Sequence, residues 1–287
     1  MNNQTALTAR YIDLLKKSLL NDLYIENEAK LIYTINAIAT GSQVELSGIF
    51  NIHKDINLIQ LLRNIKDTGD SIIFPTNITG VELRNLAELS HTMIGRKRLE
   101  NIQYCVERVI SDNVPGDFIE TGVWRGGATI FMRGILAAYD INDRRVFVAD
   151  SFEGVPPPSH KEDEGFDLSA SVYPILAVSM DEVRDLFSRY GLLDDNVVFI
   201  KGWFKDTLPK APIERLSILR LDGDLYESTM DTLNPLYDKV VQGGFIIVDD
   251  YESCQPCKNA INEFRRSRGI TEELLKIDAQ SVCWRKG

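Results

Sequence analysis

The sequence has no dense basic cluster, no long apolar run and few cysteines. Its 287 residues carry a net charge of −10, and the longest basic runs are Arg96-Lys97-Arg98 and Arg265-Arg266. Proteins that bind nucleic acid usually present a basic face, so we expect no nucleic-acid partner. No apolar run approaches the roughly 20 residues of a membrane-spanning helix. The first residues lack a secretory signal, so we expect a protein that neither enters a membrane nor is exported.

The scarcity of cysteine and histidine narrows the chemistry further. Four cysteines are too few for a disulfide scaffold at this length, and we expect a reducing, cytoplasmic location. Cys254 and Cys257 have the spacing of redox and zinc motifs, but no second pair follows at zinc spacing. We interpret them as residues at the start of a helix. Of the three histidines, only His160, in the loop 155–175, is a candidate base, and it ranks below an aspartate.

Two phosphate-binding glycine motifs, G-x-G-x-x-G and G-K-[ST], are also missing. In their place, residues 117–129 combine a short apolar strand with Gly122, Gly126 and Gly127, and a helical pattern follows. Glycine permits backbone angles and close approaches that a Cβ atom would block. A strand, a glycine turn and a helix hold nucleotide-like ligands in open α/β sheets, although the same pattern also makes a plain tight connection.

From residue 117 onward, apolar strands alternate with helical segments, which predicts an α/β fold with a doubly wound parallel sheet. The short gap 278–280 predicts a terminal hairpin with one antiparallel strand. Seven strands closed by a hairpin have the shape of the Rossmann-like class I methyltransferase sheet. The predicted strands are 118–120, 146–149, 197–200, 216–221, 245–248, 273–277 and 281–284. The predicted helices are 128–139, 180–190, 228–241 and 256–267.

The first 110 residues have a different pattern and predict a mainly helical accessory region before a sheet domain at 111–287. The turn-rich segment 111–116 marks the boundary. We expect helices at 6–24, 28–38, 59–65, 81–89 and 95–110, and a short strand at 71–74. No chemistry can be assigned to residues 26–80, which we expect to contact an acceptor or a partner.

Acidic residues stand at the ends of four predicted strands. Glu120 ends the first strand, Asp150 the second and Asp222 the fourth, and Asp249 and Asp250 end the fifth. In an open parallel sheet these ends lie at one edge, where ligands bind. Carboxylates gathered there repel one another unless a positive charge lies among them.

An acid at the end of the second strand is suited to accept hydrogen bonds from the hydroxyls of an adenosine ribose. Because dinucleotide glycine spacing is absent, this position favours S-adenosylmethionine, with Glu120 near its ammonium group. Helix capping by Asp150 or its neighbour is the alternative. The predicted cofactor-binding residues are Glu120, Thr121, Gly122, Arg125, Gly127, Asp150, Ser151, Phe152 and Trp203.

A second predicted site consists of Asp222, Asp249 and Asp250, whose hard oxygen ligands suit Mg²⁺. Caps on the following helices are the alternative for each aspartate. A divalent ion would lower the pKa of a substrate hydroxyl and position it for attack on a methyl group. Asp222 is the predicted base that accepts the proton.

A long, ordered set of motifs resembles the macrocin O-methyltransferase family. Two of them are Glu120-Thr-Gly-Val-Trp-Arg-Gly-Gly127 and Leu221-Asp-Gly-Asp-Leu-Tyr-Glu-Ser-Thr229. The others lie at 88–95, 114–117, 149–154, 190–195, 201–209 and 249–251, so the resemblance runs from about residue 81 to the end. Residues 26–80 depart from the family pattern.

The resemblance implies a class I fold, S-adenosylmethionine as methyl donor, and Mg²⁺ held by Asp222, Asp249 and Asp250, with Asp222 also the base. It implies a natural-product acceptor, often a deoxysugar hydroxyl in antibiotic biosynthesis, and a homo-oligomer, which we expect to be a dimer. Because residues 26–80 differ, two alternatives stay open. In the first alternative, the acceptor hydroxyl is phenolic or lies on a polyketide chain. In the second, this protein is a partner-docking subunit of a biosynthetic assembly line.

Overall fold

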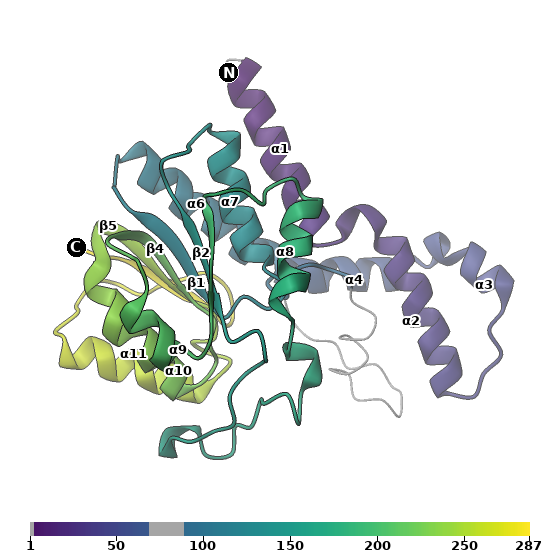
Figure 1. Cartoon of the computed structure of the whole chain (residues 1–287). Coiled ribbons are helices and arrows are strands. Elements are labelled where there is room, and N and C mark those ends of the chain that lie inside the picture. Colours follow the sequence, from purple (N-terminus) through teal and green to yellow (C-terminus); the bar gives the residue numbers. More distant parts are fainter. Residues whose placement is uncertain (1–2, 69–88) are drawn as a thin grey trace. The chain divides into compact units, whose positions relative to one another are not determined.

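A computed structural model of the chain describes residues 3–68 and 89–287 (Figure 1). The expected strand at 71–74 and nearly all of the expected helix at 81–89 lie outside these residues. The chain forms two compact units, Met1–Leu99 and Glu100–Gly287. Helix α6 (Arg96–Ser111) crosses the point of division, and the assignment of 1–110 and 111–287 as separate domains stays a prediction.

The described part of the N-terminal unit is built from helices. They are α1 (Asn3–Leu19), α2 (Ile25–Ala39), α3 (Leu46–Phe50) and α4 (Ile56–Thr68). The helix expected at 6–24 ends early, because Asn21 adopts a left-handed conformation with φ of 56°. A small apolar core joins α2 and α4 through Ala29, Ile32 and Leu62. The expected helices at 28–38 and 59–65 are confirmed.

The second unit contains a seven-stranded sheet with the order β3-β2-β1-β4-β5-β7-β6. The strands are β1 (Asp117–Thr121), β2 (Val146–Asp150), β3 (Val197–Lys201), β4 (Leu216–Leu221), β5 (Val240–Val248), β6 (Leu275–Lys276) and β7 (Val282–Arg285). Neighbouring strands from β3 to β5 pair in parallel, and β7 runs antiparallel to β5 and to β6. The predicted α/β sheet and its antiparallel closing hairpin are confirmed.

The helices between the strands are α7 (Gly127–Ala138), α8 (Met180–Arg189), α9 (Phe204–Thr207), α10 (Tyr226–Leu236) and α11 (Gln255–Ser267). The predicted helix at 228–241 is wrong at both ends. Helix α10 starts at Tyr226, and β5 starts at Val240, which pairs with Leu216. Gly243 and Gly244 interrupt the apolar pattern of β5, so the sequence did not predict that this strand starts at Val240. Within the described residues, no helix is both long and apolar enough to cross a bilayer.

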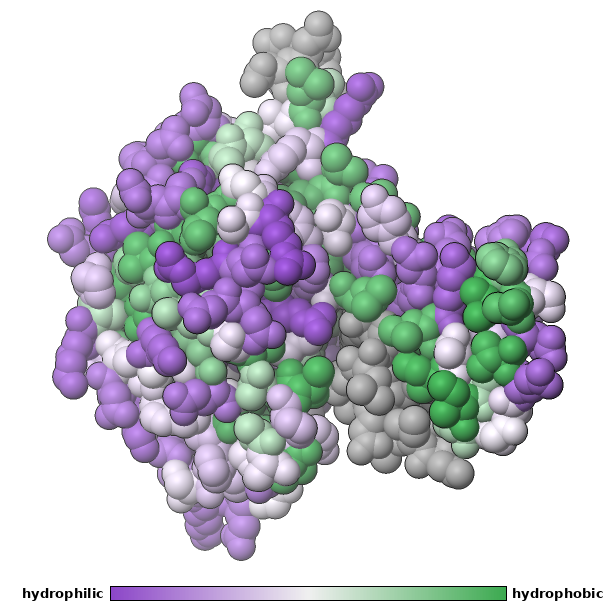
Figure 2. Space-filling view, turned by 45° about the vertical axis from the view of Figure 1, so that its right-hand side comes forward, coloured by the Kyte–Doolittle hydropathy of each residue, from purple (hydrophilic) through white to green (hydrophobic). Residues whose placement is uncertain are grey.

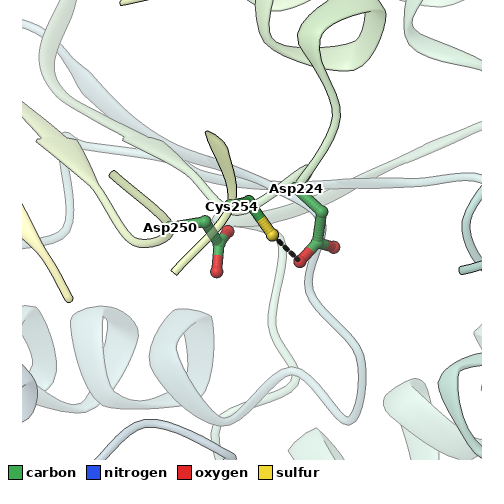
Figure 3. Close-up of side chains that lie close together, drawn as sticks. All are labelled: Asp224, Asp250 and Cys254. Carbon is green, nitrogen blue, oxygen red and sulfur yellow. Dashed lines mark hydrogen bonds between the residues drawn. The ribbon is translucent and has the colours of Figure 1, made fainter. Parts of the chain in front are cut away.

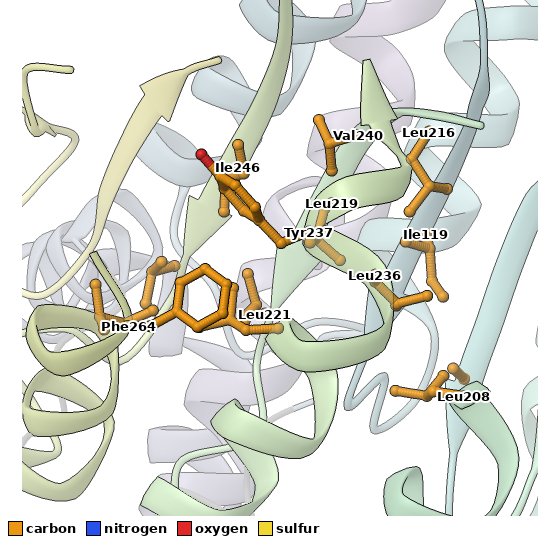
Figure 4. Packing of buried hydrophobic residues seen from close by; sticks show 14 of the residues in the cluster. Ile119, Leu208, Leu216, Leu219, Leu221, Leu236, Tyr237, Val240, Ile246 and Phe264 are labelled. Atoms are coloured by element: carbon orange, nitrogen blue, oxygen red, sulfur yellow. The ribbon is translucent and has the colours of Figure 1, made fainter. Parts of the chain in front are cut away.

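The main core lies where α10 and α11 cover one face of the sheet. Figure 4 shows Leu236 and Phe264, from these two helices, near strand residues such as Leu219, Leu221 and Ile246. These strands are almost continuously apolar because a parallel sheet is buried on both faces. Each fully buried Leu, Ile or Phe side chain stabilises the fold by about 2 kcal/mol. This packing holds the strand ends, and therefore the site, in fixed positions.

Candidate active site

The carboxyl ends of β1, β4 and β5 lie side by side in the sheet. Backbone hydrogen bonds continue past the strands, from Asp222 N to Thr121 O at 2.9 Å and from Asp249 N to Leu221 O at 2.9 Å. The strand order reverses between β1 and β4, which is where open α/β sheets bind ligands. The predicted acidic residues of these three strands therefore meet at one edge.

The glycine turn after β1 passes very close to the end of β4. Gly122 has φ of +88°, and a Cβ atom there would lie 1.8 Å from the carbonyl oxygen of Asp222. Gly126 also has a positive φ, and its missing Cβ leaves room for Val183. Gly127 is the first residue of α7. The packing of the turn thus already requires glycine at 122 and 126, and the ligand-binding role of Gly122 and Gly127 stays a prediction.

One functional residue was missed by sequence reasoning. Arg220 is fully buried in β4, where it is the register partner of Glu120 on β1. Its Nη1 donates to Glu120 and, at 2.6 Å, to Asp222, and its Nη2 donates to Asp249. Arg220 supplies the positive charge that the acidic strand ends require. Its signal was available, because residues two apart on a strand face the same side and Asp222 follows at that spacing.

The environment of Glu120 fits a ligand that carries a positive charge. Burial raises the pKa of Glu120 to about 8, Arg220 opposes this rise, and the negative charges of Asp222 and Asp249 add to it. Its Oε2 atom is buried and accepts no hydrogen bond from any residue between 3–68 or 89–287. A buried oxygen without a donor is unfavourable. The ammonium group of an amino-acid ligand would supply that donor.

Asp222, Asp249 and Asp250 come together as predicted. Each offers a carboxylate oxygen, and these oxygens lie within 4.8 Å of one another. Asp222 and Asp249 each direct one oxygen toward Arg220, which orients both carboxylates. A group of carboxylate oxygens is the donor set that Mg²⁺ prefers, with water and substrate completing its shell. These three residues therefore fit a divalent cation.

A second group beside it consists of Asp224, Asp250 and Cys254 (Figure 3). The Cys254 thiol donates to Asp224 Oδ1 at 3.9 Å. Burial raises the pKa of Asp224 to about 7, and Asp222 and Asp249 contribute to the rise. Burial also raises the pKa of the Cys254 thiol, and nearby aspartates raise it further. In this structure Cys254 therefore acts as a hydrogen-bond donor to Asp224.

The cysteine pair has the structural position expected from the sequence. Cys254 directly precedes α11, and Cys257 is buried inside the helix. Burial raises the pKa of the Cys257 thiol well above its ordinary value. The interpretation of both residues as helix-start cysteines is confirmed.

Asp150 joins the end of β2 to the glycine turn. Its Oδ2 accepts a hydrogen bond from Val123 N and its Oδ1 accepts one from Phe152 N, both at 2.7 Å. Burial raises the pKa of Asp150, and these two hydrogen bonds oppose the rise. The carboxylate therefore already has a structural role. The Ser151 hydroxyl also lies 3.3 Å from Oδ1, and the second lone pair of Oδ2 can accept a ligand hydroxyl.

Three further predicted cofactor residues are engaged within the protein. The Thr121 hydroxyl donates to the carbonyl of Arg220 at 3.3 Å, and every residue of β1 is buried. The Ser151 hydroxyl donates to the carbonyl of Gly154 at 2.7 Å. Phe152 is buried with a left-handed φ of 58°. These contacts explain all three residues structurally, and their cofactor contacts stay predictions.

Arg125 and Trp203 lie on the loops that follow β1 and β3. The Arg125 guanidinium is 4.5 Å from the centre of the Trp124 ring. Trp203 is half-buried directly before α9, and its carbonyl accepts a hydrogen bond from Thr207. Both residues follow the carboxyl ends of parallel strands, which is compatible with the predicted contacts.

Comparison with known proteins adds independent findings. The family model described as macrocin O-methyltransferase (TylF) matches residues 8–286. The chain is 57% identical over 200 residues to a demethyldecarbamoylnovobiocin O-methyltransferase of Streptomyces niveus, covering 69% of this chain and 76% of that protein. It is 52% identical over 205 residues to an 8-demethyl-8-(2,3-dimethoxy-alpha-L-rhamnosyl)-tetracenomycin-C 4'-O-methyltransferase of Streptomyces olivaceus, covering 70% and 78%. The solved structure of the O-methyltransferase NovP matches with a TM-score of 0.76 and 44% identity, over 97% of this chain and 99% of that one.

Proposed function

This chain belongs to the macrocin O-methyltransferase family and is an S-adenosylmethionine-dependent O-methyltransferase of antibiotic biosynthesis, and we propose that it requires Mg²⁺ and methylates a sugar hydroxyl. One observation carries the proposal. The oxygens of Asp222, Asp249 and Asp250 lie within 4.8 Å of one another, and Arg220 joins this group to Glu120, whose buried Oε2 has no hydrogen-bond partner among the described residues. A cation site thus adjoins a site for an ammonium group at one sheet edge.

Some residues of this sheet edge bind the methyl donor, and others act on the acceptor hydroxyl. Glu120 accepts a hydrogen bond from the ammonium group of S-adenosylmethionine, and Asp150 accepts hydrogen bonds from its ribose. When bound at Asp222, Asp249 and Asp250, Mg²⁺ would lower the pKa of the acceptor hydroxyl and polarise it. Asp222 takes the proton from that hydroxyl as the oxygen attacks the methyl group. Arg220 keeps these acids in place throughout.

The choice of a sugar acceptor rests on two arguments. The relative from Streptomyces olivaceus is named for a rhamnosyl substrate, and its aligned region covers most of its own length. A sugar hydroxyl is also a weaker acid than a phenol. Its methylation therefore depends more on a base and a bound cation, which this group of aspartates is suited to provide.

Mass spectrometry of the reaction tests the proposal. Purified protein is incubated with S-adenosylmethionine and a glycosylated natural product, its aglycone or a simple phenol, and each product is checked for one added methyl group. We expect methylation of the glycoside alone, loss of turnover with a chelator and recovery with added Mg²⁺. Product from the phenol alone would overturn the sugar acceptor. Turnover that persists with the chelator would overturn the metal requirement.

A strain that lacks the gene would identify the acceptor. We expect its extracts to contain a metabolite that is lighter by one methylene group than the normal product, and the purified protein to convert that metabolite. An unchanged metabolite profile in a strain that normally makes the product would argue against a biosynthetic role.

The proposal includes a homodimer. Exposed apolar side chains gather at the surface of the N-terminal unit, as Figure 2 shows, and Ile38, Leu46, Phe50 and Ile56 are each at least 68% exposed. Contiguous apolar patches on soluble proteins mark contact sites. We expect light scattering to give a dimer, and Phe50→Glu with Ile56→Glu to give a monomer. A monomeric wild-type protein at micromolar concentration would contradict this.

A further inference from the structure

The connection between β2 and α8 is long and is built almost without regular structure. Residues 151–179 contain only the short 3-10 turns Lys161–Asp163 and Pro174–Leu176, and one isolated bridge between Val155 and Ser169. Ordered connections of this length are usually functional. The contacts that hold this segment show where it lies.

Its first anchor is a buried aspartate. Asp163 has no exposed surface, and its two carboxylate oxygens accept hydrogen bonds from Tyr226 N at 2.6 Å and Glu227 N at 3.1 Å. These are the first two residues of α10, whose own N-cap residue, Leu225, has no polar side chain. Asp163 therefore caps α10 from a distant segment.

Neighbouring residues strengthen this anchor. The His160 ring stacks on the Tyr226 ring with centroids 4.5 Å apart. Asn259 on α11 donates to the Glu162 carboxylate at 3.0 Å. Residues 159–163 are thus held against the starts of α10 and α11. Helix α10 begins two residues after Asp224, so this end of the segment lies next to the cation site.

The second anchor lies at the glycine turn. Trp124 Nε1 donates to the carbonyl of Ile175 at 3.0 Å, and Trp124 itself has a left-handed φ of 48°. Hydrogen bonds therefore hold the segment at one point beside the predicted cofactor-binding turn after β1 and at another beside the aspartates of the predicted cation site. Between these points Phe166, Val172 and Tyr173 are at least 37% exposed.

We propose that residues 155–175 form the wall of the site that contacts the acceptor, and that Asp163 is the positioning residue that holds this wall at the metal edge. The inference rests on the proposed function. Phe166 and Tyr173 give the wall an apolar, aromatic surface. The acceptor it fits is a glycoside with a large apolar aglycone, which packs on this surface while its sugar lies at Asp222.

Kinetics of Asp163→Asn and Asp163→Ala test the role of Asp163. The matched control is Asp185→Asn, an exposed aspartate of the following helix α8 whose carboxylate pairs with Arg189 one turn later in the same helix. We expect Asp163→Ala to raise the KM for the acceptor about tenfold while the KM for S-adenosylmethionine changes less than about twofold. Asparagine has one acceptor oxygen where the carboxylate uses two. The acceptor KM of Asp163→Asn should therefore lie between those of the wild type and Asp163→Ala. The control should match the wild type.

Two results would overturn the inference. If Asp163→Ala lowers the melting temperature but leaves the acceptor KM unchanged, Asp163 is only a helix cap. If both KM values rise together, the wall does not act on the acceptor selectively. A second variant, Tyr173→Ser, alters the exposed surface without touching either anchor. It should raise the acceptor KM at an unchanged melting temperature, and an unchanged KM would overturn the contact with the acceptor.

Failure of the proposed function is distinguishable from failure of this inference. If no acceptor is methylated by the wild-type protein, the proposed function fails. The anchor can still be measured by limited proteolysis within residues 155–175, which should be faster in Asp163→Ala than in Asp185→Asn. Equal cleavage rates would overturn the anchoring role, whatever the acceptor.

Discussion

Arg220 donates a hydrogen bond through Nη1 to the Glu120 carboxylate, and both side chains are buried at paired positions of β4 and β1. The same guanidinium binds Asp222 and Asp249. One cation therefore joins the residue proposed to hold the ammonium group of the donor to two proposed metal ligands. The two halves of the site are mechanically linked through this side chain.

Arg220→Met should disable both halves. It leaves three buried or half-buried carboxylates without their cation, which should cost about 3–5 kcal/mol of stability. It should also weaken binding of S-adenosylhomocysteine and of Mg²⁺, each measured by calorimetry. The matched control is Arg133→Met, since Arg133 is also buried but pairs with Asp194, which precedes the amino end of β3. The control should lose stability alone. Wild-type affinities for both ligands in Arg220→Met would contradict the linkage.

The acidic strand ends were predictable because strand ends follow from apolar runs, and a parallel sheet places those ends at one edge. Glu120, Asp222 and Asp249 were found in this way. Arg220 was not, although its spacing to Asp222 indicates that the two side chains face the same side. Its other two partners, Glu120 and Asp249, come from β1 and from the end of β5, and they lie far away in the sequence.

The role of Asp163 could not be predicted from the sequence for the same reason. It was one of several acidic residues in a polar loop, with no local pattern to distinguish it. Its burial follows from its bonds to Tyr226 and Glu227, more than sixty positions later. The start of α10 at Tyr226 was missed for the same reason, because its cap comes from another segment. Tertiary contacts rather than propensities determine both features.

Gly122→Ala should displace the end of β4. The added Cβ would lie 1.8 Å from the Asp222 carbonyl oxygen, at a φ of +88° that alanine rarely adopts. We expect a loss of at least about 2 kcal/mol in chemical denaturation. Gly165→Ala is the matched control, with the same φ of +88° and no atom within 4 Å of its Cβ. Equal losses in the two variants would mean that backbone strain, and not the contact with Asp222, requires glycine at 122.

The stability of the ligand-free protein should depend on pH through Glu120. Burial raises the pKa of Glu120 from 4.5 to about 8, so the folded protein holds this proton more tightly than the unfolded chain does. The resulting stability is complete below about pH 4.5 and is lost as the pH rises through about 8. We expect urea denaturation to give a lower free energy of unfolding at about pH 8.5 than at about pH 5.5. Glu120→Gln cannot ionise and should show a smaller decrease, with Asp224 accounting for part of what is left. An identical decrease in both proteins would exclude Glu120 as the source.

The N-terminal unit contains a buried ion pair of its own. Lys66 Nζ lies 2.8 Å from the Glu28 carboxylate, with both side chains at most 5% exposed. Lys66→Met should cost about 3–5 kcal/mol because it leaves Glu28 buried without a cation. Adding Glu28→Leu should restore most of this loss. The exposed pair of Lys17 and Asp13 is the control, and Lys17→Met should cost less than about 1 kcal/mol. No recovery in the double variant would show that Glu28 is not the source of the penalty.

Asp222 and Asp249 should respond differently to added metal. Both are proposed ligands, but only Asp222 is also the proposed base. Asp249→Asn weakens the cation site, so high Mg²⁺ should restore much of its turnover. Asp222→Asn removes the proton acceptor as well, and its kcat should stay lower by about 10²–10⁴-fold at any Mg²⁺ concentration. Turnover titrated with Mg²⁺, at saturating donor and acceptor, separates the two cases. Recovery of Asp222→Asn to near the wild-type rate would make Asp222 a metal ligand only, and the acceptor proton would then have to leave by another route.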